Sequence, residues 1–138
     1  MTPTLQIAAA ILLNERQQVL LVRKRGTTAF MQPGGKVDTG EQPLEALIRE
    51  LHEELGLVTT AEAATFLGKY QAPAANEPGF KVDCALYRVT LRAGDQAVPA
   101  AEIAEAVWVA VDKPGDLPLA PLTRDVILPL LGRQLLPP

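Results

Sequence analysis

The chain has 138 residues, of which 48% are hydrophobic, and its formal net charge is −3. This length suits one domain with a real core, so we expect a single domain over residues 1–138. The acidic balance, without a basic stripe, argues against duplex DNA or RNA as a partner. The single cysteine, Cys84, cannot form an intramolecular disulfide, which fits a cytoplasmic protein. We expect Cys84 to be a buried or half-buried strand residue rather than a nucleophile.

The first third of the chain predicts two strands and a short third one. Residues 5–13 are apolar but too few to span a membrane, and no positive residue precedes them as in an export signal. We interpret them as a buried strand. Residues 18–23 predict a second strand, paired with the first as a hairpin across the turn at 14–17. After a polar loop at 24–28, a short strand over 30–36 ends in a Pro-Gly-Gly turn.

A helix is predicted over residues 43–55, because proline suits the first turn of a helix and Gly56 follows as a C-terminal stop. Its apolar residues recur with helical spacing and form one stripe. The stripe consists of Leu44, Leu47, Ile48, Leu51 and Leu55. We expect this stripe to face the core and the acidic face of the helix to point away from it.

The second half predicts three strands and a closing helix. The strands are expected over 65–71, 80–91 and 104–111, separated by an Ala- and Pro-rich loop at 72–79 and by a loop at 93–101. The helix is expected over 122–133, with apolar positions at Val126, Ile127, Leu130 and Leu131. These elements favour a mixed β-sheet between helices.

Three carboxylates, Glu50, Glu53 and Glu54, crowd the last turn of the first helix. Negative charge there is disfavoured by the helix dipole, by roughly 0.3–1 kcal/mol per group. At about 100° per residue the three share one arc, with Arg49 beside it. A bound cation is the expected compensation, since hard ions such as Mg²⁺ prefer oxygen ligands. The alternative is a solvated acidic surface. His52 falls off the arc, and we interpret it as solvated.

The spacing around this turn resembles the Nudix box, G-x5-E-x7-R-E-U-x-E-E-x-G-U, where U is a bulky aliphatic residue. Every fixed position is matched without insertion, by Gly35, Glu41, Arg49, Glu50, Leu51, Glu53, Glu54, Gly56 and Leu57. Chain length, strand order and flanking motifs extend the resemblance to most of the chain. It implies an α/β fold of the Nudix type, an α/β/α sandwich with a mixed central β-sheet.

The resemblance also implies a metal site. Glu50, Glu53 and Glu54 would ligate one or more Mg²⁺ or Mn²⁺ ions, with Arg49 orienting the first of these carboxylates. A backbone carbonyl of the Gly-Gly turn, which we assign to Gly34, would join the metal shell. The structural positions of the motif would be Gly35, Glu41 and Gly56.

A further carboxylate often completes the site in the mutation-preventing branch of the family, a few residues before a tryptophan that starts a strand. Here Trp108 begins such a segment, and Glu102 lies six residues before it. Glu105 is the competitor, disfavoured because it falls within the expected strand. An exposed loop glutamate without a function is the alternative for either residue.

The implied reaction is hydrolysis of a phosphoanhydride in a nucleoside diphosphate linked to another moiety. A water molecule would attack phosphorus, activated by the metal and by a carboxylate acting as general base. The catalytic candidates are Arg49, Glu50, Glu53, Glu54 and Glu102. Which glutamate takes the proton and how many metal ions bind stay open.

Substrate contacts are expected near the glycine turn. One or two cations among Arg23, Lys24 and Arg25 would bind phosphate, or would form a solvated strand end. Phe30 would stack on a base or pack in the core. Gly35 and Lys36 complete the expected substrate-binding set.

Two further segments bear on the substrate. The loop at 72–80 is expected to reach toward the cleft. Family branches that remove oxidised guanine nucleotides tend to carry asparagine near the start of the last helix, where this chain offers Thr123 or Arg124. This departure puts specificity for oxidised guanine in doubt.

Two other functions compete with the pyrophosphohydrolase. A non-catalytic Nudix-like ligand sensor is disfavoured because the box is intact. A structural acidic domain without metal would leave three glutamates at the wrong helix end unexplained. The expected partner is a nucleotide or nucleotide derivative, without membrane association, and the resemblance makes a homodimer an option.

Overall fold

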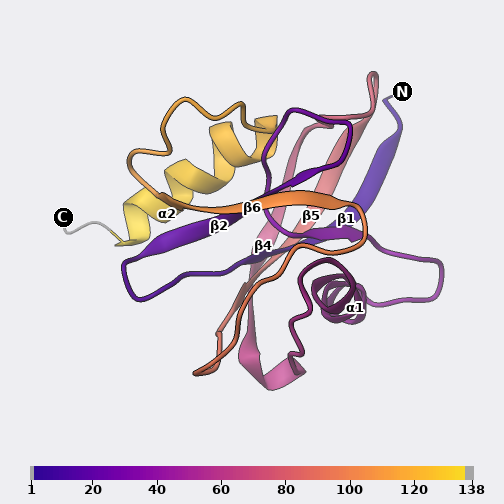
Figure 1. Cartoon of the computed structure of the whole chain (residues 1–138). Helices are drawn as coiled ribbons and strands as arrows, with labels where there is room; N and C mark the ends of the chain where they lie inside the picture. Colours follow the sequence, from indigo (N-terminus) through magenta and orange to yellow (C-terminus); the bar gives the residue numbers. More distant parts are fainter. Residues whose placement is uncertain (1, 136–138) are drawn as a thin grey trace.

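Two β-sheets lie between helices α1 and α2 in the computed structural model, which describes residues 2–135 (Figure 1). The strands are β1 (Thr4–Ile11), β2 (Gln18–Lys24), β3 (Gly34–Lys36), β4 (Ala64–Pro73), β5 (Lys81–Val89) and β6 (Ile103–Ala110). The helical segments are α1 (Pro43–Leu55), η1 (Ala61–Ala63), η2 (Thr123–Ile127) and α2 (Leu128–Leu135).

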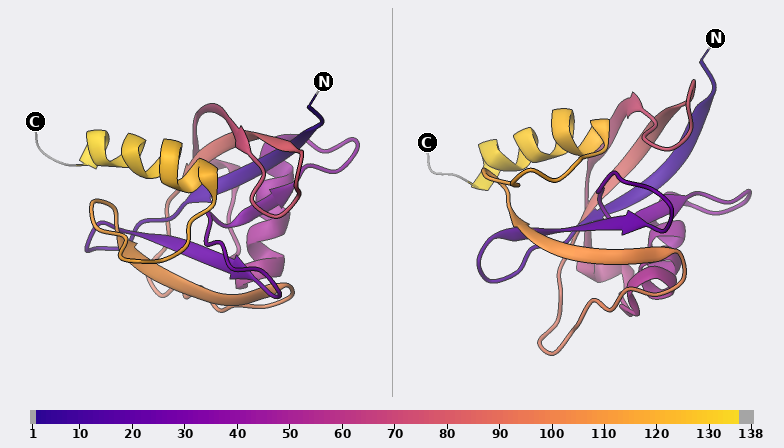
Figure 2. Two further views of the ribbon diagram at one scale, coloured as in Figure 1. Left: turned by 90° about the horizontal axis from the view of Figure 1, so that it is seen from above. Right: turned by 45° about the horizontal axis from the view of Figure 1, so that its top comes forward.

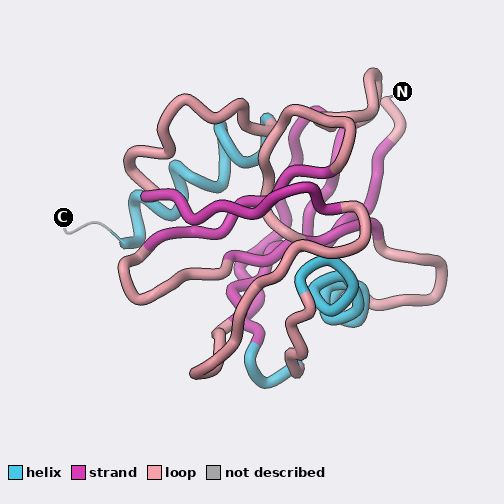
Figure 3. The backbone as a smooth tube through the Cα atoms, in the orientation of Figure 1, coloured by secondary structure: helices cyan, strands magenta, loops and turns pink. Residues whose placement is uncertain are grey.

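The larger sheet is mixed, as expected. Its strand order is β3-β1-β5-β4, in which β1 and β5 are parallel and the other neighbours antiparallel. Strands β2 and β6 form a separate antiparallel pair, seen as two neighbouring strands in Figure 3. The predicted hairpin between the first two strands is confirmed only beside its turn, where Leu13 and Val19 form an antiparallel bridge and the N–H of Leu20 donates to the carbonyl of Leu12 at 3.0 Å. Further along the pairing stops, because both edges of β1 are occupied by β3 and β5, and β2 pairs with β6 instead.

Strand β1 supplies both halves of the core because its side chains alternate between the two faces of the sheet. Ala9 and Ile11 join the apolar cluster that includes Leu128 and Leu131 of α2. Ala8, Ala10 and Leu12 join the cluster that includes Leu47, Leu51 and Leu55 of α1. The two helices thus cover opposite faces, as the views in Figure 2 show, and the expected sandwich is confirmed.

Helix α1 has the predicted bounds. At its start the Gln42 N–H donates to the Glu45 carboxylate at 2.8 Å, and at its end Gly56 has a φ of 69°. Glycine adopts that left-handed conformation without steric cost, so the chain can turn away from the helix. One expectation is wrong: the acidic face does not point away from the core throughout, because Glu54 is buried beneath the Gly-Gly turn.

The last helix contains a wide turn that the sequence pattern did not indicate. In η2 the N–H of Leu128 donates to the carbonyl of Thr123, five residues earlier, and α2 follows. Pro129 has no N–H to donate, and wide turns of this kind accommodate such interruptions. Thr123 consequently lies fully buried against the core instead of facing solvent.

Smaller differences concern strand lengths and one side chain. The strand expected over 30–36 shrinks to β3, while Phe30 and Met31 make isolated bridges to Leu119 and Val22. Cys84 is buried in β5, and its burial raises the pKa of the thiol to about 12, which fits a packing role. Within residues 2–135 no helix has the length and apolar character needed to cross a membrane.

Candidate functional site

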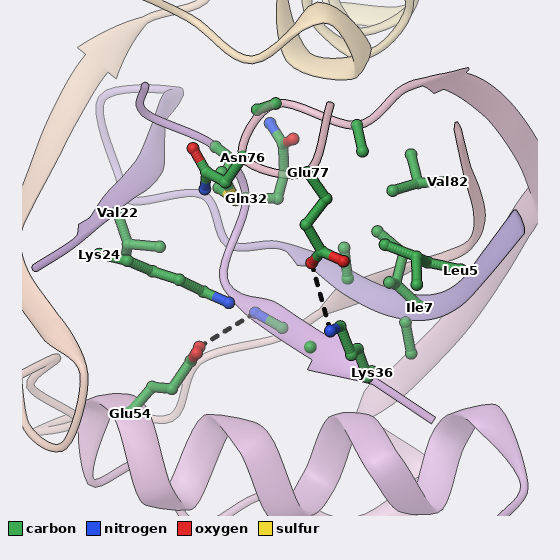
Figure 4. A pocket seen from close by; sticks show the side chains of 17 residues that line it. Leu5, Ile7, Val22, Lys24, Gln32, Lys36, Glu54, Asn76, Glu77 and Val82 are labelled. Atoms are coloured by element: carbon green, nitrogen blue, oxygen red, sulfur yellow. Dashed lines mark hydrogen bonds and ion pairs between the residues drawn. The ribbon is translucent and has the colours of Figure 1, made fainter. Parts of the chain in front are cut away.

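A buried carboxylate, Glu54, lies at the centre of the candidate site. Only 5% of this residue is exposed, and its Oε1 accepts a hydrogen bond from the N–H of Gly34 at 3.2 Å (Figure 4). Burial raises the pKa of Glu54 to about 7, with a smaller push from the charges of Glu50 and Glu102. The Gly34 N–H and the charge of Lys24 act in the opposite direction. The positive groups around Glu54 therefore do not compensate for the burial of its charge.

Arg49 fixes the neighbouring carboxylate Glu50. The guanidinium donates through Nε and Nη2 to both oxygens of Glu41, each at 2.9 Å, and through Nη1 to Glu50 at 2.8 Å. The fork to Glu41 lowers the pKa of that carboxyl to about 2 and raises the pKa of Arg49. Glu53 is half exposed and only 3.5 Å from Nη1. Arg49 thus links the carboxylates of Glu41 and Glu50.

The two glycines of the turn allow backbone and carboxylates to approach closely. A Cβ on Gly35 would lie 2.6 Å from the carboxyl carbon of Glu50. A Cβ on Gly34, whose φ is 147°, would overlap the carbonyl oxygen of Ala8 in the neighbouring strand. Gly35 therefore leaves room for the side chain of Glu50, and Gly34 leaves room for strand pairing.

The segment before β6 docks onto the end of α1. The N–H of Ala100 donates to the carbonyl of Glu54 at 2.8 Å, and the N–H of Val98 donates to the carbonyl of Leu55 at 3.0 Å. These bonds satisfy carbonyls that a helix end leaves without partners. They also bring Glu102 close enough for its charge to raise the pKa of Glu54.

Glu105 is placed differently from Glu102. It lies within β6, opposite Arg23, and accepts a hydrogen bond from Arg23 Nε at 2.8 Å. Arg23 also donates to the carbonyl of Thr27 at 2.8 Å. Arg23 and Glu105 therefore form a cross-strand pair, and Arg23 does not line the cleft described next.

A cleft opens above Glu54 and encloses about 620 Å³, including space at its open mouth. Lys24, Gly35 and Lys36, three of the predicted substrate-binding residues, line it. Residues 74–77 form one wall, so the expected approach of this loop to the cleft is confirmed. The loop is held there by an ion pair between Lys36 and Glu77, at 3.2 Å (Figure 4).

The cleft also contains residues that the sequence did not single out. Leu5, Ile7 and Val82 form an apolar wall, and Gln32 lines the same cavity. Gln32 could have been noticed as a polar residue between Met31 and Pro33 in an apolar stretch. Of the two roles left open for Phe30, the structure shows packing: the ring is buried in the apolar cluster next to α2.

The donor atoms have the chemistry of a hard-cation site, although the carboxylates are not gathered around one point. Across residues 2–135 no three His, Cys, Asp or Glu side chains converge as metal ligands would. Glu50 is turned toward Arg49, and the carboxylate of Glu54 contacts the amide of Gly34. The ligands on offer are oxygens, which suit Mg²⁺ or Mn²⁺, and the buried charge of Glu54 would be relieved by a cation. The residues therefore fit a divalent ion.

Comparisons with known proteins identify the family. The family model described as NUDIX domain matches residues 3–131. A protein of Bacillus subtilis (strain 168) named "Putative 8-oxo-dGTP diphosphatase" is 37% identical over 114 residues, which are 83% of this chain and 70% of that protein. An RNA pyrophosphohydrolase of Francisella tularensis subsp. mediasiatica is 51% identical over 49 residues, which are 36% of this chain and 32% of that protein. The chain thus spans about a third of the RNA pyrophosphohydrolase.

Solved structures show the same fold. The MutT protein from Methanosarcina mazei Go1 superposes with a TM-score of 0.77 at 21% identity, covering 96% of each chain. The match to the family model over nearly all of the sequence, with the box residues placed as described, shows that this chain belongs to the Nudix hydrolase family.

Proposed function

We propose that the protein hydrolyses a phosphoanhydride in a nucleoside diphosphate linked to another moiety, with Mg²⁺ or Mn²⁺ as cofactor. The observation that carries this proposal is one cleft that joins the buried carboxylate of Glu54 to the ammonium groups of Lys24 and Lys36. A polyphosphate needs cations around its oxygens, and an attacking water needs a carboxylate and a metal. The cleft offers the ammonium groups and the carboxylate at the same end.

The residues would divide the work as follows. The metal would be held by Glu50, Glu53, Glu54, Glu102 and the carbonyl of Gly34. When bound, it would neutralise phosphoryl charge and lower the pKa of a coordinated water. Arg49 holds the Glu50 carboxylate in one orientation through its fork to Glu41. Lys24 and Lys36 would attract the phosphates into the cleft.

The relatives support a nucleotide substrate. The Bacillus subtilis relative is named for 8-oxo-dGTP and the Francisella relative for RNA, and both names describe cleavage of a nucleotide polyphosphate. A role in clearing unwanted nucleotides from the cytoplasmic pool is consistent with both. A lone buried thiol such as Cys84 remains reduced in that compartment.

The test is a substrate panel with Mg²⁺. Nucleoside triphosphates, nucleotide sugars, dinucleoside polyphosphates and ADP-ribose are incubated with the protein, and release of mononucleotide, phosphate or pyrophosphate is measured. We expect one class to be cleaved with turnover that stops when EDTA is added. Absence of turnover on every member of the panel, or turnover that EDTA leaves unchanged, would contradict the proposal and favour the ligand-sensor alternative.

The proposed role of Glu102 can be tested by substitution, with Glu105, three residues away, as the matched control. We expect Glu102→Gln to lower kcat about 10- to 100-fold, because it removes a carboxylate near Glu54 from the proposed metal shell. Glu105→Gln should leave kcat within about threefold, since an exposed ion pair contributes little. The measurement is kcat as a function of Mg²⁺ concentration. Equal effects of the two substitutions would remove Glu102 from the site.

A further inference from the structure

The side-chain amide of Gln32, which lines the cleft, is hydrogen-bonded through only one of its two polar atoms. The side chain of Thr123 donates to Gln32 Oε1 at 2.8 Å, and Thr123 is fully buried while Gln32 is 6% exposed. Within the described residues, the other amide atom, Nε2, is buried without a hydrogen-bond partner. A buried donor without an acceptor costs free energy and is uncommon in folded proteins. Such a group is explained most simply by a ligand that supplies the acceptor.

The position of Gln32 indicates which part of a ligand it would meet. The cavity that it lines also contains Lys24 and Glu54, which belong to the phosphate end (Figure 4). Leu5, Ile7 and Val82 provide apolar surface in the same cavity. An adjoining slot shares part of this apolar wall and is lined by both Gln32 and Thr123.

A nucleoside phosphate has the same distribution of chemistry. Its charged phosphates match the end with the ammonium groups of Lys24 and Lys36, and its flat base matches an aliphatic slot that contains a few placed polar groups. The edge of the base that reaches Gln32 would meet an N–H donor. An oxygen acceptor on the base would satisfy that donor, whereas an amino group there would place two donors face to face.

We propose that Gln32 is the base-reading residue of the cleft and selects nucleotides whose base carries a carbonyl oxygen at C6 of a purine or C4 of a pyrimidine (guanine, hypoxanthine, uracil) over those with an amino group there (adenine, cytosine). This proposal rests on the proposed function of the site and adds the class of base to it. Gln32 Nε2 donates to the carbonyl oxygen of the base. Thr123 is a positioning residue: its hydroxyl holds Oε1, so that the NH₂ group is the part of the amide left for the ligand.

Thr123 can play this part because of the wide turn η2. The turn begins at Thr123 and joins this residue to Leu128 through a backbone hydrogen bond. Arg124, the other residue considered near the helix start, is exposed and paired with Asp125 at 2.8 Å. The helix start therefore directs the neutral hydroxyl, and not the guanidinium, toward the amide of Gln32.

The test measures binding instead of turnover. Dissociation constants are determined by calorimetry for hydrolysis-resistant α,β-methylene nucleotides, in two pairs that differ by a carbonyl or an amino group on the base: inosine against adenosine, and uridine against cytidine. We expect the wild type to bind at least one carbonyl-bearing nucleotide about tenfold more tightly than its partner, the factor that one well-placed buried hydrogen bond gives. A preference below about twofold in both pairs, or no binding of any of the four, would overturn the proposal.

Three variants identify the residue responsible. Gln32→Glu replaces the donor by an acceptor and should invert or abolish the preference. Gln32→Leu should bind both members of each pair equally, and it carries the test if a buried glutamate prevents folding. Thr123→Val keeps the shape of the side chain, removes the hydroxyl and should reduce the preference by about threefold or more. Preference retained in Gln32→Leu would overturn the proposal.

The outcomes separate this inference from the function on which it rests. Carbonyl preference in binding without any hydrolysis of the substrate panel would contradict the proposed reaction and leave Gln32 as the reader of the base. Hydrolysis that is indifferent to the base, with equal dissociation constants, would contradict the role of Gln32 and leave the reaction standing.

Discussion

Replacing Glu54 with glutamine is expected to abolish hydrolysis and to stabilise the metal-free protein above neutral pH. The folded state raises the pKa of Glu54 from 4.5 to about 7, chiefly by burial, so it holds the proton more tightly than the unfolded chain does. This favourable contribution is complete below about pH 4.5 and is lost as the pH rises through 7. The cost of a charged Glu54 at pH 8 is of the order of 3 kcal/mol, and glutamine avoids it.

The measurement is unfolding by urea with EDTA at pH 5 and pH 8. The wild type should lose stability between these two pH values relative to Glu54→Gln, and Mg²⁺ should restore part of the loss at pH 8 because it binds the charged carboxylate. Turnover of Glu54→Gln should fall by about 10²- to 10⁴-fold. The control is Glu53→Gln, whose side chain is 51% exposed and should change stability little. The same pH dependence in wild type and Glu54→Gln would contradict the assignment of the buried charge.

Substitutions of the two adjacent glycines of the turn are expected to have different effects, one on stability and the other on activity. Gly34→Ala should destabilise the fold by about 3 kcal/mol or more, because its Cβ overlaps the backbone of Ala8 and its φ of 147° disfavours any side chain. Gly35 has no positive φ, and the three atoms nearest to an added Cβ all belong to the carboxyl group of Glu50. We expect that variant to fold while losing activity, since Glu50 must leave its place beside Arg49.

Thermal unfolding and kcat, measured on both variants, distinguish these outcomes. Gly40→Ala is the control for backbone strain alone, because Gly40 has a φ of 85° and open space around it. It should cost about 1 kcal/mol and leave kcat unchanged. A stable Gly34→Ala protein, or a Gly35→Ala protein with wild-type turnover, would contradict the close approach described at the turn.

The sequence predicted the parts of the site that are encoded locally. Helix α1 and its stop at Gly56 follow from side chains within a few residues of one another, and so does the pairing of Arg49 with Glu50. Strand pairing is not local in this way. The hairpin expected between the first two strands forms only beside its turn, because the segment leading into β3 takes the rest of that edge: the carbonyl of Pro33 accepts the N–H of Ala10 where β2 would have continued.

The helical wheel also misjudged Glu54, for a related reason. A wheel divides residues into faces of an isolated helix, and it contains no information about the Gly-Gly turn that covers one edge of the acidic arc. Gln32 and Thr123 are 91 residues apart, so their hydrogen bond could not be inferred from spacing. The parts of the site that were missed are those that the tertiary fold alone brings together.

The docking of residues 98–100 onto α1 has a practical consequence for protein engineering. The amides of Val98 and Ala100 anchor the second half of the long connection before β6, while Gly94, in its first half, is exposed with open space around it. A peptide tag or fluorophore attachment site inserted at Gly94 would extend into solvent. The anchored half would keep Glu102 in its position beside the end of α1. The same insertion placed between Ala100 and Glu102 would move the carboxylate of Glu102 away from that of Glu54.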